Sequence, residues 1–158
     1  MFLLFRGKRV GGSVDPYTPG ITTLTMNRNA CNDEKDHKLG SGYWGTLLHE
    51  VFHVFGITHT QRREDRGKFV TVFWDNIKPE AQAQYEICPQ SICKLYPDVP
   101  YECNSIMHYK ERAFSVDGVK RTMISKNPAS CYPKYLIDEM NIPTKNDWKL
   151  LRKVLGCN

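Results

Sequence analysis

Residues 49–66 read HEVFHVFGITHTQRREDR, and this stretch holds three of the five histidines of the chain. His49 and His53 are four residues apart, so on a helix their side chains project from one face, one turn from each other. That spacing suits two imidazoles on a single zinc ion. Glu50 is rotated by about 100° from His49 around the helix, where it cannot join them as a ligand but can reach a water held by the metal. The pattern predicts a zinc site with a general base beside it.

His59 can share that ion only if the helix ends before it. In a continued helix, His59 would lie about 15 Å along the axis from His49. Gly56 removes this difficulty, because glycine tolerates the left-handed backbone that ends a helix and turns the chain. Three neutral imidazoles leave a fourth position for water, as a catalytic zinc site requires. Two histidines alone could be polar residues at the edge of a core, but the added glycine and third histidine favour a metal site.

Composition and charge narrow the class of protein. The chain has 158 residues, the size of one domain with a real core. It is 41% hydrophobic and 25% charged, and its net charge of +5 is spread among acidic residues. The densest basic stretch, residues 61–68, is interrupted by Glu64 and Asp65, so we expect no nucleic-acid surface. No apolar run approaches the roughly 20 residues that span a bilayer, so we expect no membrane anchor.

Six cysteines indicate an oxidising compartment and disulfide bonds. None of them forms a Cys-x-x-Cys pair, and the fifteen possible pairings of six cysteines stay open from the residues alone. The first residues, MFLLFRGKRV, have an apolar run too short for a secretory signal. A chain truncated at its N-terminus would reconcile the cysteines with the missing signal.

The remaining elements are expected to be short. Strands are predicted at residues 2–5 and 21–26 and within residues 68–77. A helix is predicted from Thr46, as N-cap, to Gly56, and a short helical stretch at residues 79–85. A loose hairpin is predicted over residues 110–124, with its turn at Asp117 and Gly118.

The last helix is predicted to begin at Thr144, with Asp147 completing a capping pattern. Four residues share its apolar face: Trp148, Leu151, Val154 and Leu155. Helices and short strands together predict an α+β fold.

A second motif, SIMHY, occupies residues 105–109. Alone it is weak, since methionine is most often core filler and a lone His108 is more often structural than a ligand. Together the two motifs resemble the astacin family of metzincin zinc metalloendopeptidases, whose pattern is H-E-x-x-H-x-x-G-x-x-H-E-x-x-R-x-D-R followed by S-x-M-H-Y. The matching residues are His49, Glu50, His53, Gly56, His59, Arg63, Asp65, Arg66, Ser105, Met107, His108 and Tyr109. The similarity extends to YWGTLLHE, FVTVFWDNI and RAFS, and covers most of residues 1–158.

The resemblance implies a metzincin-like zinc peptidase domain over residues 1–158, with two subdomains around an active-site cleft. Residues 1–59 would be what remains of an incomplete N-terminal subdomain, with the active-site helix. Residues 60–158 would be the C-terminal subdomain, with the Met-turn and the terminal helix. One Zn²⁺ per chain would be bound by His49, His53 and His59.

The resemblance also assigns roles around the ion. Glu50 would activate the attacking water, and Tyr109 would be an extra zinc ligand that swings away and stabilises the oxyanion. Met107 would form the apolar Met-turn beneath the metal. The strand at residues 21–26 would pair with an extended substrate. The residues that bind substrate side chains stay unassigned.

The expected function is therefore a secreted zinc endopeptidase that hydrolyses peptide bonds of protein substrates through a zinc-bound water activated by Glu50. The alternative is a catalytically impaired or truncated relative that acts as a non-catalytic zinc-binding module. Two departures from the family support that alternative. Thr60 stands where the family has a glutamate that contacts the buried N-terminus of the matured enzyme, and a first helix and strands would precede residues 2–5. No oligomeric state is predicted.

The cysteines divide in two groups by the same resemblance. Cys31 and Cys157 match family positions. The other four look like additions, and the expected pairs are Cys88 with Cys93 and Cys103 with Cys131.

Overall fold

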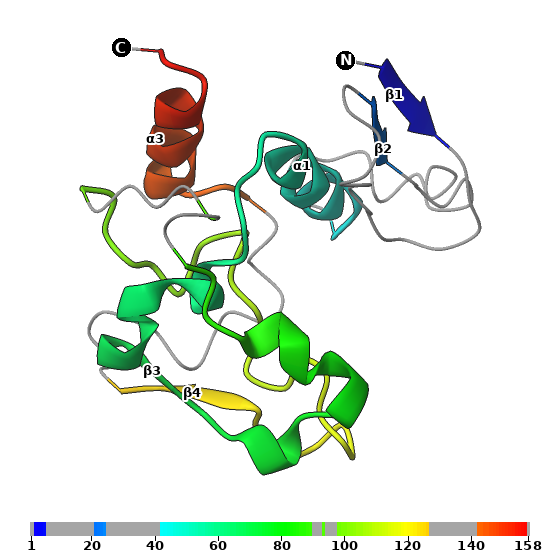
Figure 1. The fold of residues 1–158 in the computed structure, drawn as a ribbon, viewed down its shortest axis with the longest axis vertical. Helices are drawn as coiled ribbons and strands as arrows, with labels where there is room; N and C mark the ends of the chain where they lie inside the picture. Colours follow the sequence, from blue (N-terminus) through cyan, green and yellow to red (C-terminus); the bar gives the residue numbers. More distant parts are fainter. Residues whose placement is uncertain are drawn as a thin grey trace.

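The computed structural model describes residues 2–5, 21–24, 42–89, 93, 98–126 and 142–157. Within these ranges the chain is an α+β fold of two α-helices, four short strands and several 3₁₀ helices (Figure 1). The α-helices are α1 (Gly42–Val54) and α3 (Lys145–Val154), and the strands are β1 (Phe2–Phe5), β2 (Ile21–Leu24), β3 (Val70–Val72) and β4 (Met123–Ser125). The 3₁₀ helices are η3 (Thr60–Arg62), η4 (Glu64–Lys68), η5 (Trp74–Asn76) and η6 (Pro79–Tyr85).

Helix α1 ends as predicted but begins earlier. Its first residue is Gly42, so Thr46 lies inside the helix and the prediction that it is the N-cap was wrong. At the other end Gly56 has φ +81°, the left-handed conformation. The Gly56 N–H donates to His53 O (2.9 Å) and the Ile57 N–H to Phe52 O (3.1 Å), which is the Schellman pattern of a helix C-terminus. Ile57 and Phe52 also share one hydrophobic cluster, the apolar contact that accompanies this motif.

The strands form two separate pairs. Strands β1 and β2 are parallel, with Phe2 opposite Ile21, and β3 and β4 are antiparallel, with Val70 opposite Ser125. The predicted strand over residues 68–77 is thus only three residues long before η5 begins.

The loose hairpin predicted over residues 110–124 is found in part: the N–H groups of Thr122 (2.7 Å) and Met123 (3.2 Å) fold back to donate to Glu111 O, while strand β4 pairs along its length with β3. Its turn does form. Gly118 has φ +74°, and Asp117 Oδ1 accepts the N–H groups of Val119 and Lys120. The side-chain acceptor therefore shapes a tight turn without needing paired strands on both sides.

Helix α3 packs against α1 and begins with the predicted capping box. Thr144 Oγ1 accepts the Asp147 N–H (3.1 Å), and Asp147 Oδ2 accepts the Thr144 N–H (2.9 Å). Leu151 and Val154 pack on the core as predicted, whereas Trp148 is 46% exposed and touches Phe52 by its ring edge. Leu155, also predicted on the apolar face, is half exposed.

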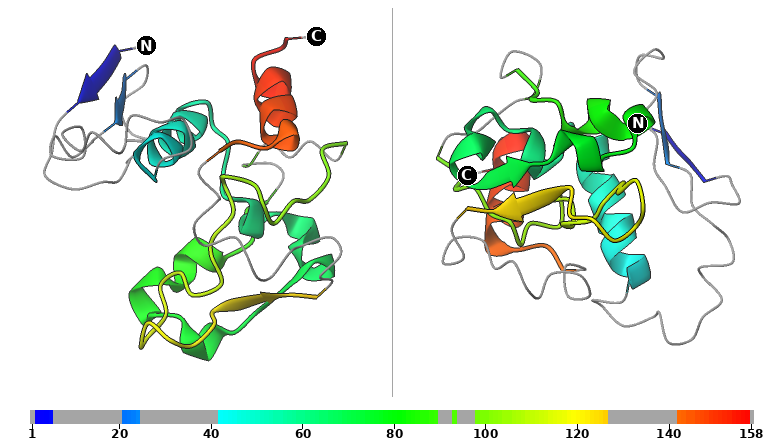
Figure 2. Two further views of the ribbon diagram at one scale, coloured as in Figure 1. Left: turned by 180° about the vertical axis from the view of Figure 1, so that it is seen from behind. Right: turned by 90° about the horizontal axis from the view of Figure 1, so that it is seen from below.

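The core beneath the histidine helix is a cluster of Phe52, Ile57, Ile106 and Met107, which we call the Met-turn cluster. Side chains from both helices cover it, namely Leu48, Leu150, Leu151 and Val154. Figures 1 and 2 show α1 and α3 at one end of the molecule and the β3–β4 pair with most 3₁₀ helices at the other. No helix in the described ranges has the length and apolar character that a membrane span needs.

The structure contains the predicted Cys88–Cys93 disulfide. Cys103 is disulfide-bonded as well. Its predicted partner, Cys131, lies outside the described residues, as does Cys31. Cys157 is a free, exposed thiol.

Candidate metal centre

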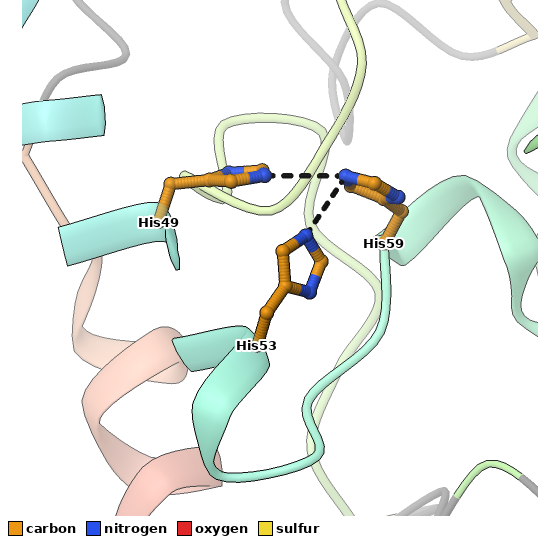
Figure 3. Close-up of side chains that lie close together, drawn as sticks. All are labelled: His49, His53 and His59. Atoms are coloured by element: carbon orange, nitrogen blue, oxygen red, sulfur yellow. Dashed lines mark hydrogen bonds between the residues drawn. The ribbon is translucent and has the colours of Figure 1, made fainter. Parts of the chain in front are cut away.

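Three half-buried imidazoles converge at the end of α1. His49 and His53 project from one face of the helix, and the turn at Gly56 brings His59 back toward them (Figure 3). The Nε2 atom of His59 lies 3.1 Å from Nε2 of His49 and 3.1 Å from Nε2 of His53. The three ligand atoms lie within 4.8 Å of one another.

Backbone carbonyls fix the orientation of two of these rings. His49 Nδ1 lies 2.7 Å from Ile106 O, and His53 Nδ1 lies 2.7 Å from Ile57 O. Because a carbonyl oxygen only accepts, each Nδ1 must carry the proton, which leaves the Nε2 lone pair for a ligand. The turn that ends α1 therefore also orients His53, since Ile57 belongs to it.

Burial favours the neutral form of His53 and His59. It lowers the pKa of His59 to about 2, with the neighbouring His53 and His49 adding to the effect. The pKa of His53 is lowered for the same reason, burial first and His49 second. Neutral imidazole is the form that binds a metal.

The residues present fit zinc. Two lone pairs, those of His49 and His53, point at the same nitrogen of His59, and one proton on that nitrogen cannot satisfy both. A cation between the three removes this conflict. A tetrahedral site with Zn–N distances of about 2.0–2.1 Å needs nitrogens about 3.3 Å apart, close to the 3.1 Å from His59 Nε2 to each of the other two.

Two further predicted residues lie at this cluster. Glu50 is half-buried on α1, and its charge partly opposes the lowering of the His53 pKa that burial and His49 cause. The Tyr109 ring packs at a tilt against the His59 ring, with centroids 4.3 Å apart. Burial, with Tyr85 and Glu50 adding to it, raises the pKa of Tyr109 to about 12, so its phenol keeps its proton at neutral pH.

The backbone of Tyr109 is held on both sides by buried side chains. Its N–H donates to Gln61 Oε1 (3.0 Å), and its carbonyl accepts from His108 Nδ1 (2.7 Å). His108 Nε2 in turn accepts from the Tyr101 hydroxyl (2.8 Å), so both ring nitrogens of His108 are used inside the protein. His108 is structural, as predicted. Sequence reasoning missed Gln61, which is fully buried although it stands in a charged stretch.

Met107 lies in the Met-turn cluster and is 1% exposed. Its carbonyl accepts the Thr60 N–H (2.9 Å), so Met107 is bonded to the residue that follows His59. A surface hollow opens beside His49 and Tyr109, and Lys110, Arg112 and Phe114 line its rim. Of the three clustered histidines, His49 lines this hollow.

Comparison with known proteins agrees with this geometry. A family model described as Astacin, a peptidase family, matches residues 36–154. Zinc metalloproteinase nas-9 of Caenorhabditis elegans is 34% identical over 160 residues, which cover 98% of this chain and 26% of the relative. Zinc metalloproteinase nas-5 of the same species is 36% identical over 113 residues, or 72% of this chain and 30% of the relative. The chain thus spans less than a third of the length of these relatives.

The fold also matches a solved structure. It is high choriolytic enzyme 1, a hatching enzyme zinc-protease from Oryzias latipes (medaka fish). The TM-score is 0.73, and the match covers 99% of this chain and 70% of that one at 24% sequence identity.

Proposed function

Because this chain belongs to the astacin family of peptidases, we propose that it is a zinc-dependent endopeptidase that hydrolyses peptide bonds of protein substrates. One observation carries the proposal. Three imidazole Nε2 atoms converge within 4.8 Å of one another, His49 among them lines a surface hollow, and Glu50 follows His49 directly on α1. The cofactor is Zn²⁺, and His49, His53 and His59 are its proposed ligands, one ion per chain. Bound zinc lowers the pKa of a water from about 15.7 to about 7 and polarises a carbonyl group.

Glu50 is the proposed general base. It follows His49 directly on α1, so its carboxylate would reach past the ligands to the attacking water. It would take a proton from that water and pass it to the leaving amine. General acid–base catalysis of this kind contributes about 10²–10⁴ to a rate.

Tyr109 is the proposed donor to the oxyanion. Its phenol is protonated at neutral pH, and burial, which raises its pKa to about 12, keeps the proton on it well above that pH. It can therefore donate a hydrogen bond to the charge that develops on the scissile carbonyl, where losing one donor costs about 10²–10³ in rate. Before substrate binds, Tyr109 would be a further ligand of the ion. Met107 would support the site from below as the apolar Met-turn.

The proposal extends to the setting of the site. An extended substrate would pair with β2, which lies between β1 and α1 (Figures 1 and 2). The domain would divide after His59 into the two subdomains expected from the sequence. The Cys88–Cys93 disulfide supports a secreted protein, since such bonds persist in oxidising compartments.

The test compares the wild type with Glu50→Gln, and uses Glu80→Gln, an exposed glutamate at the start of η6, as the control. We expect one zinc per chain in all three and cleavage of a quenched fluorescent peptide library by the wild type and the control. Cleavage should fall by at least about 10² in Glu50→Gln. Undiminished cleavage in that variant contradicts the role of Glu50. Zinc binding without cleavage in any of them would support a non-catalytic zinc-binding module instead.

A further inference from the structure

One buried carboxylate outside the histidine cluster has more hydrogen bonds than its local role requires. Asp147, in the first turn of α3, is 3% exposed. Its Oδ1 accepts from Ser105 Oγ (2.5 Å), and its Oδ2 accepts the N–H groups of Ile106 (3.0 Å) and Thr144 (2.9 Å). Only the bond to Thr144 belongs to the capping box of α3. The other two reach across to the Met-turn.

The first branch from Asp147 leads to the third histidine. A carboxylate only accepts, so Ser105 donates to Asp147. The Ser105 oxygen then accepts from Thr60 Oγ1 (3.1 Å) and from the Met107 N–H (3.0 Å). The single donor and both acceptor positions of this hydroxyl are used. Thr60 directly follows His59, so two hydroxyls connect Asp147 to the backbone that carries His59.

The second branch leads to the first histidine. The N–H of Ile106 donates to Asp147, and the carbonyl of the same residue accepts from His49 Nδ1 (2.7 Å). A shift of Ile106 would move the acceptor that sets the ring orientation of His49. Each branch consists of two hydrogen bonds. One ends at Thr60, the residue after His59, and the other ends at His49 itself.

We propose that Asp147 is a positioning residue for the metal centre, which holds residues 105–107 so that His49 and His59 keep their orientation toward the ion. The proposal rests on the proposed function for the identity of the ion. It also gives Thr60 a role. An ionised glutamate at position 60 could not donate to Ser105, so the branch to His59 depends on a hydroxyl at this position.

Four variants test the positioning role. Asp147→Asn keeps the shape but replaces one acceptor oxygen by an NH₂ group, so at least one of the three bonds is lost. Thr60→Val removes the donor to Ser105, and Thr60→Ser restores it. Asp98→Asn is the matched control, because Asp98 pairs with Lys149 and Lys153 of α3 on the surface and makes none of the bonds to residues 105–107.

Three measurements are made on each variant: zinc affinity by competition with a chelator, the visible spectrum of the Co²⁺-substituted protein, and unfolding of the metal-free chain. We expect zinc affinity to fall about 10–100-fold in Asp147→Asn, the range for residues that orient metal ligands. The cobalt bands should shift in the same variant. Thr60→Val should lose affinity in the same direction, with recovery in Thr60→Ser and no change in Asp98→Asn.

A purely structural Asp147 would give a different result. Asp147→Asn would then unfold more easily while zinc affinity and the cobalt spectrum stay unchanged, and this outcome overturns the proposal. If Asp147→Asn does not fold, Thr60→Val decides, and wild-type affinity in it overturns the proposal. Peptide cleavage is recorded separately. A wild type that binds zinc but cleaves nothing contradicts the proposed peptidase function and leaves the affinity comparison to decide on Asp147.

Discussion

Acid should destabilise the metal-free chain through His108, by an amount that follows from its surroundings. The ring is buried, with Nδ1 2.7 Å from Tyr109 O and Nε2 2.8 Å from the Tyr101 hydroxyl. Since the carbonyl only accepts, Nδ1 carries the proton and Nε2 accepts from Tyr101. The neutral ring is fully satisfied in this arrangement. Burial accordingly lowers the pKa of His108 from 6.5 to about 4, although the bond to Tyr109 acts in the opposite direction.

The direction of this pH effect follows from which state of the chain, folded or unfolded, binds the proton more readily. Below pH 6.5 the unfolded chain takes up a proton on this side chain, whereas the folded chain does so only near pH 4. Protonation therefore favours the unfolded state over this window. The contribution of the neutral His108 side chain to folding stability is complete above pH 6.5 and is lost as the pH falls toward 4. The difference in pKa corresponds to roughly 3 kcal/mol in total.

The assay is denaturant unfolding of the metal-free wild type and of His108→Gln at several pH values between 7 and 4. Glutamine keeps an acceptor for Tyr101 but does not titrate. His53 and His59 titrate in both proteins, so the difference between the two slopes isolates His108. We expect the wild-type free energy of unfolding to fall more steeply, by up to about 1.4 kcal/mol per pH unit. Equal slopes between pH 6.5 and 4.5 would refute this account of His108.

Two further predictions concern the stability of the histidine helix and its turn. Phe52→Ala should lower the free energy of unfolding by about 3–5 kcal/mol in urea titrations, because Phe52 is 1% exposed in the Met-turn cluster, and a loss below about 1 kcal/mol would contradict that packing. Gly56→Ala should lower the free energy of unfolding by about 1–2 kcal/mol, because alanine is strained in the left-handed backbone of this residue. No steric clash contributes, since an added Cβ would meet nothing within 4 Å. Gly67→Ala, equally uncrowded but without positive φ, is the control, and equal thermal shifts in the two variants would show that the conformation of Gly56 is not the cause.

The parts of the site that could be predicted are those set by residues near each other in the chain. The spacing of His49 and His53, the turn at Gly56 and the cap at Thr144 each follow from local backbone geometry, and the structure contains all of these features. The start of α1 could not be predicted in this way. Gly45 disfavours a helix by its own propensity, yet it is buried inside α1, where tertiary packing decides.

The contacts that support the site join residues far apart in sequence. Asp147 was predicted only as a cap, because its bond to Thr144 spans three residues and leaves a recognisable pattern. Its bonds to Ser105 and Ile106 span 42 and 41 residues and leave none. Gln61 likewise reaches Tyr109 across 48 residues. A polar residue with no periodic neighbours gives no sign in the sequence that it is buried.

The short span of the histidine cluster has a consequence for how the chain folds. His49 and His59 are ten positions apart, and one helix with its closing turn brings their rings together. Closing so short a loop costs little chain entropy and needs no distant part of the molecule. The bond from His49 to Ile106 closes a loop of 57 residues and forms only with the whole domain. Local order alone can therefore bring the three rings together, whereas the carbonyl that orients His49 arrives only with the folded domain.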